Sequence, residues 1–155
     1  MEYTTRTMYC GTVHVYYLTN GILHFFPLIG FDRILFAATN EKTKIKHLNF
    51  AVRSLTKAGL ASTAAMAHAL VLRADVHLES YPQNIDQALE DTMKAIDIDS
   101  LHGRAWRVLA DVREAKGDIL EAMEAVSKWA DVNPEFHAKA TKELQRLRVT
   151  AGGTP

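Results

Sequence analysis

Apolar and helix-ending residues recur in this chain at an offset of 34 positions, which limits the folds that it can adopt. A repeat of this length is typical of a helical hairpin, which stacks on its neighbours because it cannot bury its apolar face alone. The matched residues are Ala88 with Ala122, Leu89 with Met123, Ala95 with Trp129, Ile98 with Val132, and Ser100 with Pro134. The helical stretches before them match at an offset of 36, as in Leu70 with Trp106 and Ala74 with Ala110.

Beyond residue 40, apolar residues at spacings of three and four predict a series of amphipathic helices. The predicted helices span 45–58, 64–78, 85–98, 105–115, 119–131 and 135–148. Gly59 is expected at a helix end, since glycine readily adopts the left-handed conformation found there. Ser62–Thr63 and Asp99–Ser100 are expected to cap the helices that follow them. Pro134 suits the first turn of the last helix, with Asn133 as its cap.

The first 40 residues differ from the rest, because they hold only four of the charged side chains. Two runs rich in β-branched and aromatic residues, 12–19 and 22–26, flank Asn20–Gly21. Asn-Gly between such runs predicts a β-hairpin, because both residues tolerate the positive φ of the turn. Pro27 would end the second strand. Further on, Ile34, Leu35 and Ala38 suit one face of a short helix.

Two alternatives stay open for this apolar segment: a membrane or targeting segment, and a loosely structured chain. Residues 13–31 carry no formal charge and reach about the 19 residues that a membrane-crossing helix needs. His14, Asn20 and His24 are costly in hydrocarbon, and Pro27 interrupts a helix. We therefore favour the hairpin, and membrane contact through 13–31 is the less favoured expectation.

The composition argues against several classes of function. Eighteen basic and eighteen acidic residues give no net charge, so no nucleic-acid partner is expected. Cys10 is the single cysteine and cannot form an internal disulfide. The sequence holds no phosphate-binding glycine loop and no nucleophile or zinc motif, and its seven histidines lack ligand spacing. We expect no catalytic residue, metal or cofactor, and we expect Glu90 and Asp91 on a solvated helix face.

The repeated stretch resembles the tetratricopeptide-repeat family, whose units are helical hairpins of 34 residues. The repeat at 103–136 carries the family pattern in Trp106, Leu109, Ala110, Gly117–Asp118, Ala122 and Pro134. The repeat at 67–102 matches it more loosely, through Leu70, Arg73, Ala74, Ala88 and Ala95, with Ser100 in place of the proline. The resemblance implies a mostly α-helical fold in which antiparallel hairpins stack into a short right-handed solenoid.

This resemblance also implies how the chain is organised. We expect an apolar segment over 1–40, a helical domain over 41–148 and a flexible tail over 149–155. Within the domain, a closing helix over 135–148 should cover the second repeat through Leu144 and Leu147. A degraded repeat before residue 67 stays open, as does oligomerisation, because about three repeats are needed for a stable array.

In such a stack the first helix of each hairpin lines a concave groove, where members of the family commonly bind a peptide or helix of another protein. We therefore expect a non-catalytic scaffold or adaptor, and the alternative is a structural subunit of a larger, membrane-associated assembly. An intracellular, cytoplasmic location is expected, with organelle or membrane association left open. The candidate partner-binding residues in the groove are His68, Asp75, Arg104, Arg107, Asp111 and Glu114.

Two features of the sequence limit the binding that we expect at these groove residues. Arg107 and Asp111 lie four residues apart, so we expect them to pair along one helix. Family members that hold the acidic tails of chaperones use a lysine and an asparagine where this chain has Val71 and Asp75. A carboxylate at position 75 would repel such a tail, so the resemblance does not extend to that function.

Both tryptophans, Trp106 and Trp129, are expected to serve in core packing rather than to stack on a ligand.

Overall fold

The computed structural model describes residues 14–19, 22–27, 41–80 and 84–152. The chain divides into two compact units, residues 1–61 and residues 62–155. The predicted boundary near residue 40, and the assignment of 41–61 to the repeat domain, stay predictions.

In the first unit, strand β1 (His14–Thr19) pairs with strand β2 (Ile22–Pro27) in antiparallel fashion. Thr19 lies opposite Ile22, so two residues separate the strands and the predicted pairing is confirmed. The Asn20–Gly21 turn and the helix expected around Ile34 lie outside the described residues. Helix α2 (Glu41–Lys57) follows, and it begins four residues earlier than its apolar stripe predicts.

The membrane alternative concerned residues 13–31, and the described residues of that stretch form the two paired strands. Among all the described residues, no helix is long and apolar enough to cross a membrane. Membrane docking and oligomerisation stay expectations from the sequence.

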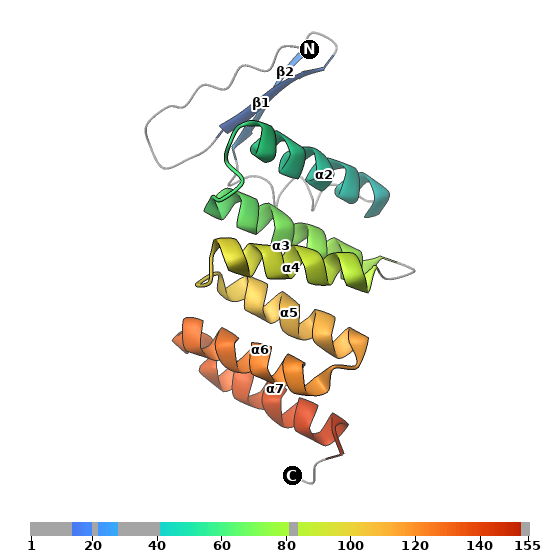
Figure 1. The fold of residues 1–155 in the computed structure, drawn as a ribbon, viewed down its shortest axis with the longest axis vertical. Helices are drawn as coiled ribbons and strands as arrows, with labels where there is room; N and C mark the ends of the chain where they lie inside the picture. The colour runs from blue at the N-terminus through green and yellow to red at the C-terminus, as the bar shows by residue number, and fades with distance from the viewer. Residues whose placement is uncertain (1–13, 20–21, 28–40, 81–83, 153–155) are drawn as a thin grey trace. The chain divides into compact units, whose positions relative to one another are not determined.

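The second unit consists of five α-helices and a short 3-10 turn over its described residues (Figure 1). The elements are α3 (Ala64–Glu79), α4 (Ile85–Ile98), α5 (Gly103–Lys116), α6 (Ile119–Val132), η2 (Pro134–Phe136) and α7 (His137–Thr150). The predicted helices are confirmed to within about two residues, apart from the first turn of the last one. Pro134 opens a 3-10 turn there instead of an α-helix.

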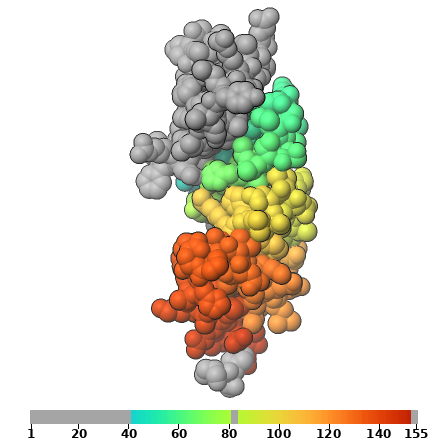
Figure 2. Space-filling view, turned by 90° about the vertical axis from the view of Figure 1, so that its left-hand side faces the viewer, coloured from blue at the N-terminus to red at the C-terminus, as the bar shows by residue number. Residues whose placement is uncertain are grey.

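These helices pack as matched pairs. α3 packs on α4 and α5 on α6, while α4 packs on α5 and α6 on α7, so that each helix contacts the next along the chain. In Figure 2 the colours of this unit follow one another in chain order, as expected of stacked hairpins. The predicted helical-hairpin repeat is therefore confirmed.

Alanines allow the helices of each pair to approach closely. Ala88 and Ala122 are completely buried, as the repeat pattern predicts, and Ala74 and Ala110 are buried on the partner helices. Leu147 of α7 is buried against the core of the second hairpin, and Leu144 packs beside it. The closing role predicted for these two leucines is confirmed.

Two caps differ from their predictions. Asn133 precedes the η2 turn without a side-chain cap hydrogen bond, and α7 begins after Phe136. His102, not Asp99–Ser100, caps α5: its Nδ1 accepts a hydrogen bond from the backbone N–H of Ala105 at 3.2 Å. A neutral imidazole offers one unprotonated nitrogen, so it can replace the side-chain oxygen of a usual N-cap. The sequence does not reveal this cap, because histidine is not a favoured residue at that position.

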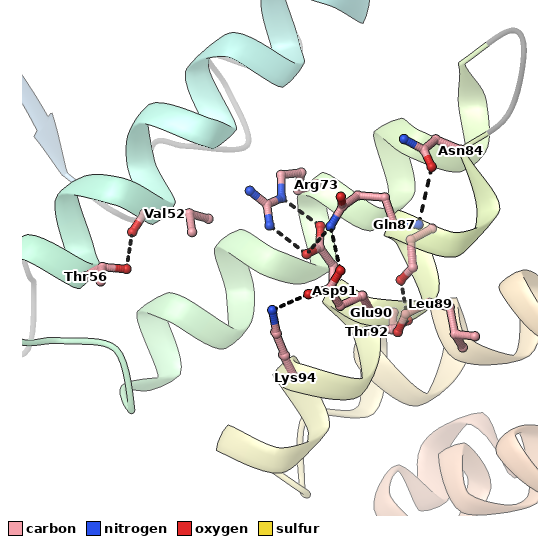
Figure 3. Close-up of polar contacts among 11 residues, drawn as sticks. Val52, Thr56, Arg73, Asn84, Gln87, Leu89, Glu90, Asp91, Thr92 and Lys94 are labelled. Carbon is pink, nitrogen blue, oxygen red and sulfur yellow. Dashed lines mark hydrogen bonds and ion pairs between the residues drawn. The ribbon is translucent and has the colours of Figure 1, made fainter.

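Asp91 overturns the expectation of a solvated helix face. Its side chain is completely buried between α3 and α4, and Arg73 donates two hydrogen bonds to it, at 2.7 Å and 2.6 Å (Figure 3). Gln87 donates a further, longer bond at 3.5 Å. Two parallel N–H···O bonds satisfy most of a buried carboxylate, which would otherwise be very costly. The first hairpin therefore holds an ion pair at its interface.

The second hairpin holds an apolar pair at the same place. By the offsets of 36 and 34, Arg73 corresponds to Leu109 and Asp91 to Ala125. Ala125 is buried, and Leu109 packs against the same core. The same interface position therefore holds an ion pair in the first hairpin and apolar side chains in the second.

Enlarging a crossing alanine should weaken the stack. We expect Ala122→Leu to lower the free energy of unfolding by about 1–3 kcal/mol, because extra methyl groups have no room at a completely buried position. Urea denaturation followed by circular dichroism measures this. Leu120→Ala is the control, since Leu120 is 75% exposed and its truncation should change little. Equal stability of Ala122→Leu and the wild type would contradict close packing at this crossing.

Breaking the buried ion pair should cost more than removing it altogether. We expect Asp91→Ala to destabilise the protein by about 3 kcal/mol, because it leaves Arg73 without its buried partner. The double variant Arg73→Leu/Asp91→Ala copies the second hairpin and should recover most of that loss. Glu90→Ala is the control, as Glu90 is exposed and its ion pair is with Lys94 on the same helix. A double variant no more stable than Asp91→Ala would refute the equivalence of the two hairpins.

Candidate functional site

A pocket of about 500 Å³ opens in the second unit where α3, α5 and α7 come together with the end of α6. Its volume lies within the range of about 300–1,000 Å³ that is usual for binding sites. The lining residues are Asp75, His102, Gly103, Arg104, Arg107, Val108, Asp111, Trp129, Asn133, Phe136 and Lys139. We call this set the groove pocket.

One wall of the groove pocket is an ion pair between two hairpins. Arg104 of α5 donates a hydrogen bond to Asp75 of α3 at 2.6 Å, across 29 residues of sequence. Both side chains are partly exposed, so the pair contributes little to stability. Its main effect is on charge, because it neutralises both groups at the pocket.

A second arginine connects the polar and aromatic sides of the pocket. Arg107 donates a hydrogen bond to Asp111 at 3.3 Å, which confirms the pairing expected at i, i+4. The same guanidinium lies 5.7 Å from the centre of the Trp129 ring. A cation at this distance from an indole is attracted by the electrons of the ring. Arg107 therefore lies between a carboxylate and an aromatic surface.

The aromatic side consists of Trp129 and Phe136, whose rings stack with centres 5.5 Å apart. Trp129 is 5% exposed and belongs to the core, as predicted, whereas Phe136 is 42% exposed. Pro134 begins the η2 turn that carries Phe136 back over α6. The sequence does not predict this contact, because the turn and not the helix places the phenylalanine.

Close packing at the start of α5 fixes another wall. A Cβ atom on Gly103 would lie 1.4 Å from Oδ1 of Asn133, so only glycine leaves room for that amide. Beside it, the rings of His68 and His102 stack with centres 6.0 Å apart. His68 therefore supports the pocket through His102 rather than lining it.

Burial shifts the ionisation of both pocket carboxyls. The pKa of Asp75 is raised above its ordinary value of 3.8, mainly by burial, although Arg104 opposes the shift. The pKa of Asp111 is raised for the same main reason, with Arg107 opposing and the charges of Asp75, Glu143 and Glu114 adding to it. The acids of the pocket thus lie close enough to repel one another.

Outside the pocket, a second ion pair connects α5 with α7. Arg146 donates hydrogen bonds to both carboxylate oxygens of Glu114, at 2.6 Å and 2.5 Å, and two more to Glu143. Hydrogen bonding by Arg146 lowers the pKa of Glu114 below its ordinary value of 4.5. Glu114, one of the candidate residues, therefore binds α7 and does not line the pocket.

The structure brings four of the six candidate residues together in one pocket: Asp75, Arg104, Arg107 and Asp111. His68 and Glu114 lie beside it. Sequence reasoning did not place Lys139, Asn133, His102 or the two aromatic rings at the site, and only the fold shows that they converge. Within the described residues, no group of three possible ligands could hold a metal ion. The pocket therefore offers paired charges and an aromatic surface.

Comparison with solved structures finds the same helical architecture elsewhere. A structure of MamA matches with a TM-score of 0.53 at 17% identity, over 81% of this chain and 77% of that one. The first tetratricopeptide repeat domain of Spaghetti (RPAP3), solved with the HSP90 peptide SRMEEVD, matches with a TM-score of 0.52 at 17% identity. That match covers 72% of this chain and 98% of the other. No protein-family model and no curated protein matches the sequence. The fold is therefore that of a tetratricopeptide-repeat array.

Asp75 and Glu114 should change the acid stability of the protein in opposite directions. The raised pKa of Asp75 means that the folded state binds a proton before the unfolded chain does, so its contribution to stability grows as pH falls towards 3.8. The lowered pKa of Glu114 gives a contribution that is present above 4.5 and is lost as pH falls further.

Melting temperatures of the wild type, Asp75→Asn and Glu114→Gln between about pH 3 and pH 7 test this. Relative to the wild type, Asp75→Asn should lose stability towards acid pH, and Glu114→Gln should gain it. Parallel curves for all three proteins would contradict the assigned shifts. Glu121→Gln, on the exposed side of α6, is the control and should follow the wild type.

Proposed function

We propose that this chain is a protein-interaction module that holds a peptide or helical segment of a partner at the groove pocket, without catalysis. Arrays of this fold are in general non-catalytic and bind other proteins, which supports the coarse assignment. The assignment of partner binding to the groove pocket is based on the residues that line it.

One observation carries the proposal: charged residues from α3 and α5 converge with Trp129 and Phe136 on a single pocket. Arginine and tryptophan are enriched among the residues that dominate the energy of protein interfaces. Arg107 combines both chemistries, because it stacks on Trp129 and presents further N–H groups beside it. The arrangement suits a partner that offers both polar and apolar side chains.

The peptide bound by the RPAP3 domain is not a guide to the partner here. Val71 is apolar and completely buried, so it offers no polar group to a peptide terminus. Asp75 already holds Arg104 and would repel a peptide with several carboxylates, such as SRMEEVD. We therefore do not extend binding of a chaperone tail to this chain.

A photo-crosslinking amino acid can locate the binding surface in cell extract. Placed at Ala138, which is exposed on α7 next to the pocket residue Lys139, it should capture a defined partner. Placed at Lys128, which is exposed on α6 outside the pocket, it should not capture that partner.

The variant Arg104→Ala/Arg107→Ala should lower that capture at least about tenfold, as expected when charged contacts at a binding site are lost. Lys142→Ala is the control variant, because Lys142 is exposed on α7 and does not line the pocket. Undiminished capture by the double variant, or equal capture from Lys128, would refute binding at the groove pocket.

A further inference from the structure

The charges that line the groove pocket do not cancel. Three cations, Arg104, Arg107 and Lys139, face two carboxylates, Asp75 and Asp111. Each arginine pairs with one carboxylate. Lys139 is exposed, and within the described part of the chain no hydrogen bond or ion pair reaches it. One positive charge is therefore left without a partner at the pocket.

An exposed aromatic ring lies next to this charge along the chain. Phe136 and Lys139 are three residues apart across the junction of η2 and α7, and both line the pocket. Stacking on Trp129 holds the phenyl ring in place while leaving it 42% exposed. A fixed, exposed ring loses little conformational freedom when a partner covers it.

From this combination we infer that the occupant of the groove pocket is a peptide segment with a single acidic side chain close to an aromatic or large aliphatic one. Its carboxylate binds Lys139 and Arg107, and its apolar side chain packs on Phe136. This inference rests on the proposed function and specifies the chemistry of the partner.

Geometry selects Arg107 rather than Arg104 as the second donor. Arg104 bonds to Asp75 at 2.6 Å, whereas the bond from Arg107 to Asp111 is longer, at 3.3 Å. A guanidinium has five N–H groups, so Arg107 can bind a second carboxylate while keeping its contact with Trp129.

The existing acids limit the partner to one carboxylate. Asp111 already lies within the fields of Asp75, Glu143 and Glu114, which help to raise its pKa. A run of acidic residues would add to this repulsion and would meet only one unpaired cation. A segment without any acid would leave Lys139 unpaired and desolvated beneath it.

Fluorescence of Trp129 provides a direct assay. Trp106 and Trp129 are the two tryptophans of the chain, so a Trp106→Phe background leaves Trp129 as the reporter inside the pocket. The probes are short synthetic peptides with one Glu and one Phe, adjacent or separated by one to three alanines. Matched peptides carry Gln for Glu, Ala for Phe, or three consecutive Glu residues.

We expect at least one Glu–Phe peptide to change the Trp129 emission on binding, and its Gln and Ala counterparts to bind about tenfold more weakly. Lys139→Ala should lower its affinity by a similar factor, while Lys142→Ala should not. Phe136→Ala should also weaken binding, whereas Val149→Ala, at an exposed apolar residue of α7, should have no effect.

Equal binding of the Gln peptide, tighter binding of the three-Glu peptide, or an unaffected Lys139→Ala variant would each overturn this inference. Crosslinking of a partner from Ala138 would then still support the proposed function. Failure of every Glu–Phe peptide to bind would also overturn the inference, and only absence of crosslinking at the pocket would remove the proposed function with it.

Discussion

Close approach of two helices at an alanine is the contact on which the rest of this fold depends. Ala88 and Ala122 are completely buried at equivalent places in the two hairpins. A methyl group there lets the paired backbones come together, so that larger side chains on either side fill the remaining space. Only when both hairpins close in this way do α3, α5 and α7 come near enough to share ion pairs. The groove pocket is a consequence of this stacking.

The sequence predicts such a contact well, because it recurs. Helix bounds, crossing alanines and the leucines of α7 all follow from periodic patterns that local physics imposes. Arg107 and Asp111 are also predictable, since a spacing of four residues brings them together on any helix. The pair between Arg104 and Asp75 cannot be predicted from the spacing of residues along one helix. It joins residues 29 positions apart and exists only once two hairpins are stacked.

Asp91 shows why residue type alone misleads inside a repeat. On its own helix it continues a polar stretch with Glu90, which favours a solvated position. The stack instead turns it towards Arg73, and bidentate bonding makes burial tolerable. The second hairpin, with Leu109 and Ala125 at the same places, shows that the fold does not require an ion pair there. Comparison of the two repeats, rather than the local sequence pattern, shows that an ion pair in one hairpin replaces an apolar contact in the other.

The position of the groove pocket follows from a second exchange of the same kind. Trp129 corresponds to Ala95, which is completely buried in the first hairpin. A methyl group at that place ends within the core. An indole is large enough to pack in the core and still reach its edge, where Arg107 and Phe136 contact it. One small-to-large replacement thus links the packing of the second hairpin to the aromatic wall of the pocket. Because the same ring serves both, changes at Trp129 should disturb stability and binding together. Changes at Lys139 should weaken binding without lowering stability.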